Sequence, residues 1–161
     1  MVDPSLGVLV VLLAIVGSGV VAGVFFAFSA VVVPGLREGS PALGAAAMRA
    51  ANRAAVRWPL MALLFGTGLL CLLAPFVVGA GNSSDGPVLG WVVAGSVLYL
   101  VGAIVVTVAG NVPLNRRLAA LDVPGSREYW PRYAERWSAR NDLRAAGSAA
   151  ACLLLLVSLV V

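Results

Sequence analysis

Apolar residues gather in four long runs along the chain, and the charged residues lie between these runs. Residues 6–33, 59–79, 87–110 and 145–161 contain no Asp, Glu, Lys or Arg. A helix needs about 17–25 apolar residues to cross a hydrocarbon core of roughly 30 Å. Lipid offers no hydrogen-bond partners to the backbone, so runs this long form helices. The pattern predicts an all-α fold, a four-transmembrane-helix bundle.

We expect one integral membrane domain over residues 1–161. Its expected segments are spans at about 6–33, 59–79, 87–112 and 141–161, joined by cytoplasmic loops at 34–58 and 113–140. Hydrophobic residues make up 61% of the chain, charged residues only 11%, and the mean hydropathy is +0.99. This composition lies outside the globular range and leaves no room for a separate soluble domain.

The positions of the basic residues predict how the chain is oriented. Ten of the 11 Lys and Arg residues lie in loops 34–58 and 113–140. Short basic loops stay in the cytoplasm, so both termini are expected outside. All the basic residues are arginine, and Ala, Gly, Val and Leu dominate, which favours a bacterial inner (plasma) membrane. The lipid bilayer is therefore the expected partner of these arginines, and nucleic acid is not.

Loop one is predicted to contain an amphipathic helix at the cytoplasmic interface. Ser40 can cap it, Pro41 suits its first position, and an alanine-rich run follows. Arg49, Arg53 and Arg57 fall on one stripe of this helix, which would face lipid headgroups.

The fourth helix is expected to begin near Pro131 and to extend into the cytoplasmic interface, because it is longer than a bilayer requires. Trp130, Tyr133 and Trp137 would form an aromatic belt there. Gly19 and Gly23 are small residues four apart, of the kind that lets helices pack closely within one chain or in a homo-oligomer.

Several classes of chemistry are excluded by residues that the chain lacks. It contains no histidine, so imidazole-ligated haem, a non-haem iron triad and a histidine-based nucleophile system are all ruled out. No acidic residue lies within any of the four apolar runs, which argues against a proton-coupled transporter. We expect no metal site and no cofactor.

Polar residues do gather at the cytoplasmic ends of the last two spans. Asn111 and Asn115 are four residues apart and share one helix face. Trp137, Asn141 and Arg144 lie on one stripe of the final helix. Such residues can be helix caps and interfacial anchors. A cluster of buried donors can also stabilise a developing oxyanion.

Blocks along nearly the whole chain resemble the anthrone oxygenase family of small membrane proteins, many of whose bacterial members are filed as a domain of unknown function. The blocks are, in order, Phe25-Phe26-Ala27-Phe28-Ser29, Pro34-Gly35-Leu36, Met48 with Asn52, Asn111-x-Pro113-Leu114-Asn115, and Trp137-x3-Asn141-x2-Arg144. The resemblance implies a four-helix membrane protein that oxidises an anthrone to an anthraquinone with O2 as co-substrate.

A mechanism follows as a hypothesis. An anthrone carbanion delocalises onto the carbonyl oxygen, and the resulting enolate can react with O2 without metal or flavin. The residues expected to hold the oxyanion are Arg144, Asn111, Asn115 and Asn141. The residues expected to bind the small hydrophobic aromatic substrate are Trp137, Phe25, Phe28 and Asn52. No general base can be named from the sequence.

Two other classes of function remain open. A non-enzymatic membrane scaffold or accessory subunit is compatible with the absence of base, metal and cofactor motifs. A transporter of small hydrophobic molecules fits the size of the chain, but the sequence lacks an intramembrane carboxylate.

Overall fold

The computed structural model describes residues 4–81 and 86–161, and within these ranges all regular elements are helices. This confirms the all-α prediction. In chain order the elements are α1 (Pro4–Ala27), η1 (Phe28–Val32), α2 (Val33–Glu38), α3 (Pro41–Ala55), α4 (Trp58–Ala80), α5 (Gly86–Tyr99), η2 (Leu100–Asn111), α6 (Val112–Ala120) and α7 (Val123–Val157). The segments η1 and η2 are π-helical.

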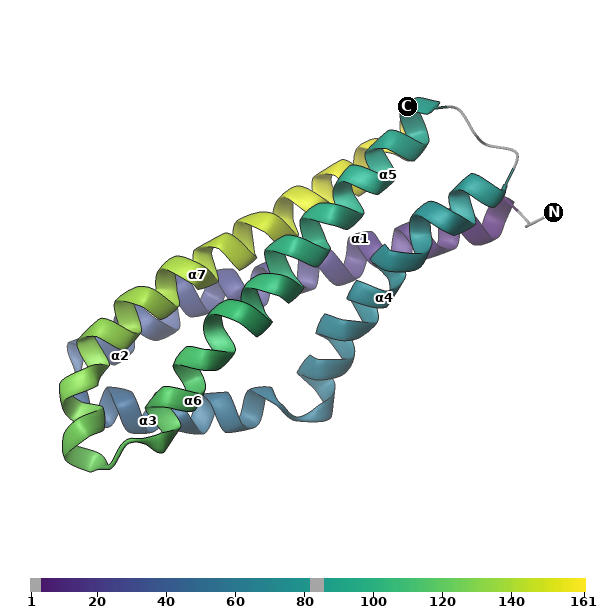
Figure 1. Cartoon of the computed structure of the whole chain (residues 1–161). Helices are drawn as coiled ribbons and strands as arrows, with labels where there is room; N and C mark the ends of the chain where they lie inside the picture. Colours follow the sequence, from purple (N-terminus) through teal and green to yellow (C-terminus); the bar gives the residue numbers. More distant parts are fainter. Residues whose placement is uncertain (1–3, 82–85) are drawn as a thin grey trace.

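Four long rods make up the molecule (Figure 1). The first consists of α1, η1 and α2, the second is α4, the third consists of α5, η2 and α6, and the fourth is α7. In Figure 1, α3 lies across the end of the molecule opposite the N and C labels. The start of α1 and the end of α7 therefore lie at one end of the molecule, and α2, α3 and α6 lie at the other.

Three of the rods are long and apolar enough to cross a membrane. They are Ser5–Glu38, Trp58–Ala80 and Gly86–Ala120. They contain the predicted spans 6–33, 59–79 and 87–112. Residues 141–161 are not among these candidates, so their crossing of the membrane stays a prediction.

The predicted helix of loop one is present as α3. The Ser40 hydroxyl accepts a hydrogen bond from the Leu43 N–H at 3.3 Å, which is the expected cap. Two of the three arginines lie on α3, and Arg49 donates to the Leu121 carbonyl at 3.1 Å. Arg57 is not on the expected stripe, because α3 ends at Ala55 and Arg57 directly precedes α4.

The last helix begins eight residues earlier than expected. Asp122 caps α7 by accepting a hydrogen bond from the Gly125 N–H at 2.8 Å, and the helix continues through Pro131. The aromatic-belt interpretation was wrong: Trp130, Tyr133 and Trp137 are buried in protein. They pack in a cluster with residues of α3 and α6, so they are screened from lipid.

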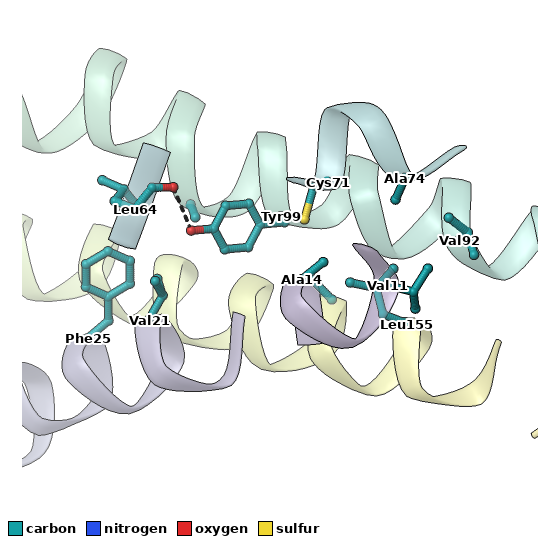
Figure 2. Close-up of a cluster of buried hydrophobic side chains, with 12 residues drawn as sticks. Val11, Ala14, Val21, Phe25, Leu64, Cys71, Ala74, Val92, Tyr99 and Leu155 are labelled. Carbon is teal, nitrogen blue, oxygen red and sulfur yellow. Dashed lines mark hydrogen bonds between the residues drawn. The ribbon is translucent and has the colours of Figure 1, made fainter. Parts of the chain in front are cut away.

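Small residues allow the closest helix contacts, although at other positions than Gly19 and Gly23. A Cβ built on Gly102 of η2 would lie 2.9 Å from the Cα of Gly147 on α7. A Cβ on Gly23 would meet nothing within 4 Å, and one on Gly19 would make an ordinary contact. In the cluster of buried hydrophobic side chains shown in Figure 2, the Tyr99 hydroxyl donates to the Leu64 carbonyl at 3.0 Å, which joins α5 to α4.

Candidate functional site

A cavity of about 110 Å³ lies where the four rods meet α3. Its walls come from α1, η1, α3, α4, η2, α6 and α7. All eight residues predicted for the site line this one cavity: Phe25, Phe28, Asn52, Asn111, Asn115, Trp137, Asn141 and Arg144. The structure thus brings together side chains that are up to 119 positions apart in the sequence. Their chemical roles stay predictions.

Arg144 is the buried cation of the cavity, with only 6% of its surface exposed. Its guanidinium carbon lies 4.1 Å from the ring centroid of Phe25 and 5.2 Å from that of Trp137. It donates to the Thr107 hydroxyl at 3.2 Å and to the Asn141 Oδ1 at 2.5 Å. In the described part of the chain no carboxylate pairs with it. A buried charge without a counter-ion is costly, so this group suits an anionic ligand.

Asn141 holds Arg144 in place and has no amide hydrogen left for a ligand. Its Nδ2 donates to the Phe25 carbonyl at 2.6 Å and to the Ser29 hydroxyl at 2.7 Å. Its Oδ1 accepts from Arg144. The side chain therefore ties α7 to α1 and η1 and sets the direction of the guanidinium. Asn141 is expected among the donors to the oxyanion, and in the structure both of its amide hydrogens are bonded within the protein.

The Asn111 carboxamide is held by α7, and its oxygen is left without a partner in residues 4–81 and 86–161. Its Nδ2 donates to the Trp137 carbonyl at 3.3 Å. Only the amide nitrogen can donate to a carbonyl, so this bond fixes which way the carboxamide points. The Asn111 Oδ1 is buried and has no partner among the described residues.

A tyrosine that sequence reasoning missed connects the remaining two asparagines. The Tyr133 hydroxyl donates to the Asn115 Oδ1 at 2.8 Å and accepts from the Asn52 Nδ2 at 3.2 Å. This leaves the Asn115 amide nitrogen as a donor and the Asn52 oxygen as an acceptor. Burial raises the pKa of Tyr133, and the Asn52 hydrogen bond offsets only part of this effect. The hydroxyl therefore stays protonated.

Tyr133 could have been found from the sequence. It lies one turn before Trp137 on the stripe that continues through Asn141 and Arg144. The aromatic-belt interpretation assigned it to lipid, and that assignment hid its place on the stripe.

Aromatic rings form one wall of the cavity. The Phe28 and Trp137 rings have centroids 5.9 Å apart and are tilted by 50°. The Trp137 Nε1 is buried without a partner among the described residues, as is the Arg144 Nε. Flat rings with two free donors suit a planar aromatic molecule that carries an oxygen.

The two π-helical segments both border this site. Segment η1 starts three residues after Phe25, and η2 ends at Asn111. Side chains of α7 bond to carbonyls near η1 and within η2: Asn141 to Phe25, and Arg140 to Gly110 at 2.9 Å. π-helical turns are rare and occur frequently at functional sites, where they redirect side chains.

Comparison with known protein families matches residues 48–154 to the family described as anthrone oxygenase. The chain belongs to the anthrone oxygenase family. The matched part of this family member contains six of the eight site residues and excludes Phe25 and Phe28. No curated protein and no solved structure matches the chain.

Proposed function

We propose that this member of the anthrone oxygenase family is a cofactor-independent oxygenase that converts an anthrone-type polycyclic aromatic to the anthraquinone with O2. The observation that carries the proposal is Arg144: a buried guanidinium that pairs with no carboxylate among the described residues, whose Nε has no partner there, and which lies over the rings of Phe25 and Trp137. A site of this kind favours a planar molecule on which negative charge develops.

The proposed reaction begins with loss of a proton from the anthrone methylene. The methylene is acidic because its carbanion delocalises onto the carbonyl oxygen. Arg144, Trp137 and the Asn115 amide would stabilise that oxyanion. The acidity of the substrate, aided by its own phenolate groups, replaces a protein base in this scheme.

Oxygen then adds to the enolate carbon. The resulting hydroperoxide loses the remaining proton on that carbon together with hydroxide, so the products are the quinone and one water. Both atoms of O2 are accounted for: one becomes the new carbonyl oxygen and one becomes water. No metal or flavin takes part in this scheme.

We further propose four membrane crossings, with residues 141–161 of the chain as the fourth. The charge-free run 145–161 supports this topology, as does the placement of the start of α1 and the end of α7 at one end of the molecule. Basic loops 34–58 and 113–140 would then face the cytoplasm of a bacterial cell, with both termini outside. The cavity would lie near the inner leaflet of the plasma membrane.

The decisive experiment measures O2 consumption and quinone absorbance with an anthrone substrate in nanodiscs. We expect the Arg144→Ala variant to lose at least about 100-fold in kcat/KM, as removal of an oxyanion donor does. The exposed Arg136 lies on the same helix, and the Arg136→Ala variant should match the wild type. Unchanged turnover by a folded Arg144→Ala protein would contradict the proposal.

The alternative is a non-enzymatic scaffold or accessory subunit. It would be supported if the wild type neither consumed O2 nor bound a flat aromatic, and instead purified with a stable protein partner. A homo-oligomer is compatible with both functions.

A further inference from the structure

A surface groove adjoins the cavity around Arg144. Four residues border both the cavity and the groove: Phe28, Ala51, Ala55 and Leu60. The outer part of the groove is lined by Ala54, Arg57, Trp58 and Pro59. The opening thus lies between η1, the last turn of α3 and the first turn of α4.

Small side chains keep this opening wide. Ala51 and Ala55 are four positions apart on α3 and share the face that borders the groove. Neither side chain extends beyond Cβ. A leucine at either position would project three further carbon atoms into the passage.

The opening lies beside the start of α4, where the apolar sequence of that helix begins. Trp58 is the first residue of α4, a helix long and apolar enough to cross a membrane. Trp58 is 79% exposed and the neighbouring Val56 is 70% exposed. An exposed tryptophan at the start of such a helix is typical of a membrane interface, so lipid is the medium outside the groove.

The size of the inner cavity adds an independent constraint. An apolar cavity of about 150 Å³ holds one benzene ring. The inner cavity of about 110 Å³ is smaller, so it cannot enclose three fused rings. A tricyclic ligand whose carbonyl edge faces Arg144 must extend into the groove, and a substituent on its outer ring would reach lipid.

We infer that this groove is a lateral portal through which a flat aromatic ligand with an apolar chain reaches the site directly from the bilayer, its chain remaining in lipid. The inference rests on the proposed function for its ligand class. It assigns to Ala51 and Ala55 the role of selecting ligands by the width of the passage.

Ligand binding tests the portal without requiring turnover. The probes are 2-methylanthraquinone and 2-dodecylanthraquinone in nanodiscs, with tryptophan quenching as the readout and affinity expressed per mole fraction of ligand in lipid. We expect the two affinities to agree within about threefold, because the dodecyl chain stays in lipid. Binding of the dodecyl compound at least 100-fold weaker than the methyl compound, or no binding of either, would overturn the portal.

Narrowing the passage supplies the second measurement. The Ala55→Leu and Ala51→Leu variants should each weaken binding of the dodecyl compound about tenfold. Ala50 is exposed on the same helix and borders neither space, so Ala50→Leu should bind like the wild type. Thermal melting of each variant shows whether it is folded. Wild-type affinities in both folded leucine variants would overturn the portal.

The two proposals fail in different ways. Equal binding of both probes without any O2 consumption would refute the oxygenase and leave the portal standing. Turnover of an anthrone combined with rejection of the dodecyl compound would refute the portal and leave the oxygenase.

Discussion

Two regions of this protein are held together by different physical means. The apolar core lies along the rods on the side of the chain termini and consists of Val11, Ala14, Val21, Phe25, Leu64, Cys71, Ala74, Val92, Tyr99, Ala103, Ala151 and Leu155 (Figure 2). The polar head surrounds the cavity and consists of Asn52, Asn111, Asn115, Tyr133, Asn141 and Arg144.

The apolar core depends on close approach of helix backbones. Gly102 of η2 lies against the backbone of Gly147 on α7. Gly95 of α5 lies against the side chain of Leu155, also on α7. Lipid tails are as apolar as these side chains, so the side chains gain little hydrophobic free energy by leaving lipid. Van der Waals packing between small residues therefore provides much of the helix association. This region tolerates changes in chemistry better than changes in volume.

The polar head depends on directional bonds instead. Asn141 bonds to the Phe25 carbonyl of α1, to the Ser29 hydroxyl of η1 and to Arg144. Tyr133 bonds to both Asn52 and Asn115. Several polar atoms of this region have no partner among the described residues. The comparison teaches that close packing holds the apolar core while directional hydrogen bonds hold the polar head, and four variants test this difference.

Removing the central bond of the polar head should have the largest effect. The Asn141→Leu variant leaves Arg144 and the Phe25 carbonyl without their partner. We expect a loss of about 3 kcal/mol in unfolding free energy and at least 100-fold in turnover. Denaturation in detergent and an O2 electrode measure the two losses. The control Asp142→Asn changes an exposed neighbour and should lower neither the unfolding free energy nor the turnover. A stable, active Asn141→Leu protein would contradict the network.

A single added carbon should disturb the apolar core more selectively. In the Gly102→Ala variant the new Cβ would lie 2.9 Å from the Gly147 Cα, so η2 and α7 must move apart. We expect a loss of about 1–3 kcal/mol, typical of overpacking. Gly23→Ala meets no atom within 4 Å and should be neutral or stabilising, because alanine favours helix. Equal melting temperatures for the two variants would refute the close contact.

Asn111 should affect ligand binding more than stability. The Asn111→Leu variant removes the free Oδ1 acceptor and one bond to the Trp137 carbonyl. For a ligand with a hydroxyl donor we expect about tenfold weaker binding, equivalent to one buried hydrogen bond. A matched ligand with that hydroxyl methylated should bind the variant and the wild type alike. An equal effect on both ligands would show that Asn111 serves only packing.

Tyr133 should give the smallest effect. The Tyr133→Phe variant frees Asn52 and Asn115 to rotate, and we expect a loss of about 1 kcal/mol and a few-fold fall in turnover. Because burial raises the Tyr133 pKa, the unfolded chain loses this proton at a lower pH than the folded chain. Wild-type stability should therefore fall as pH rises above about 10, and Tyr133→Phe should lose less over that interval. Identical pH profiles would contradict this.

Hydropathy and short motifs predicted much of the fold and pointed to side chains that line one cavity. The apolar runs predicted three rods correctly, Ser40 predicted the start of α3, and the eight site residues do line one cavity. These features depend on near neighbours in the chain, and one-face spacing along a helix already indicates which side chains act together. The start of α7 was misjudged because the Asp122 cap went unrecognised.

The sequence by itself determined that the chain is helical, which segments are apolar and which side chains share a helix face. Only the tertiary structure decided how each amide is bonded: Asn141 accepts from Arg144, Asn111 donates to the Trp137 carbonyl, and Asn52 and Asn115 meet at the Tyr133 hydroxyl. The reason is physical. The direction of a hydrogen bond depends on which carbonyl lies opposite, and that carbonyl belongs to another helix, as Phe25 does for Asn141 at 116 positions away.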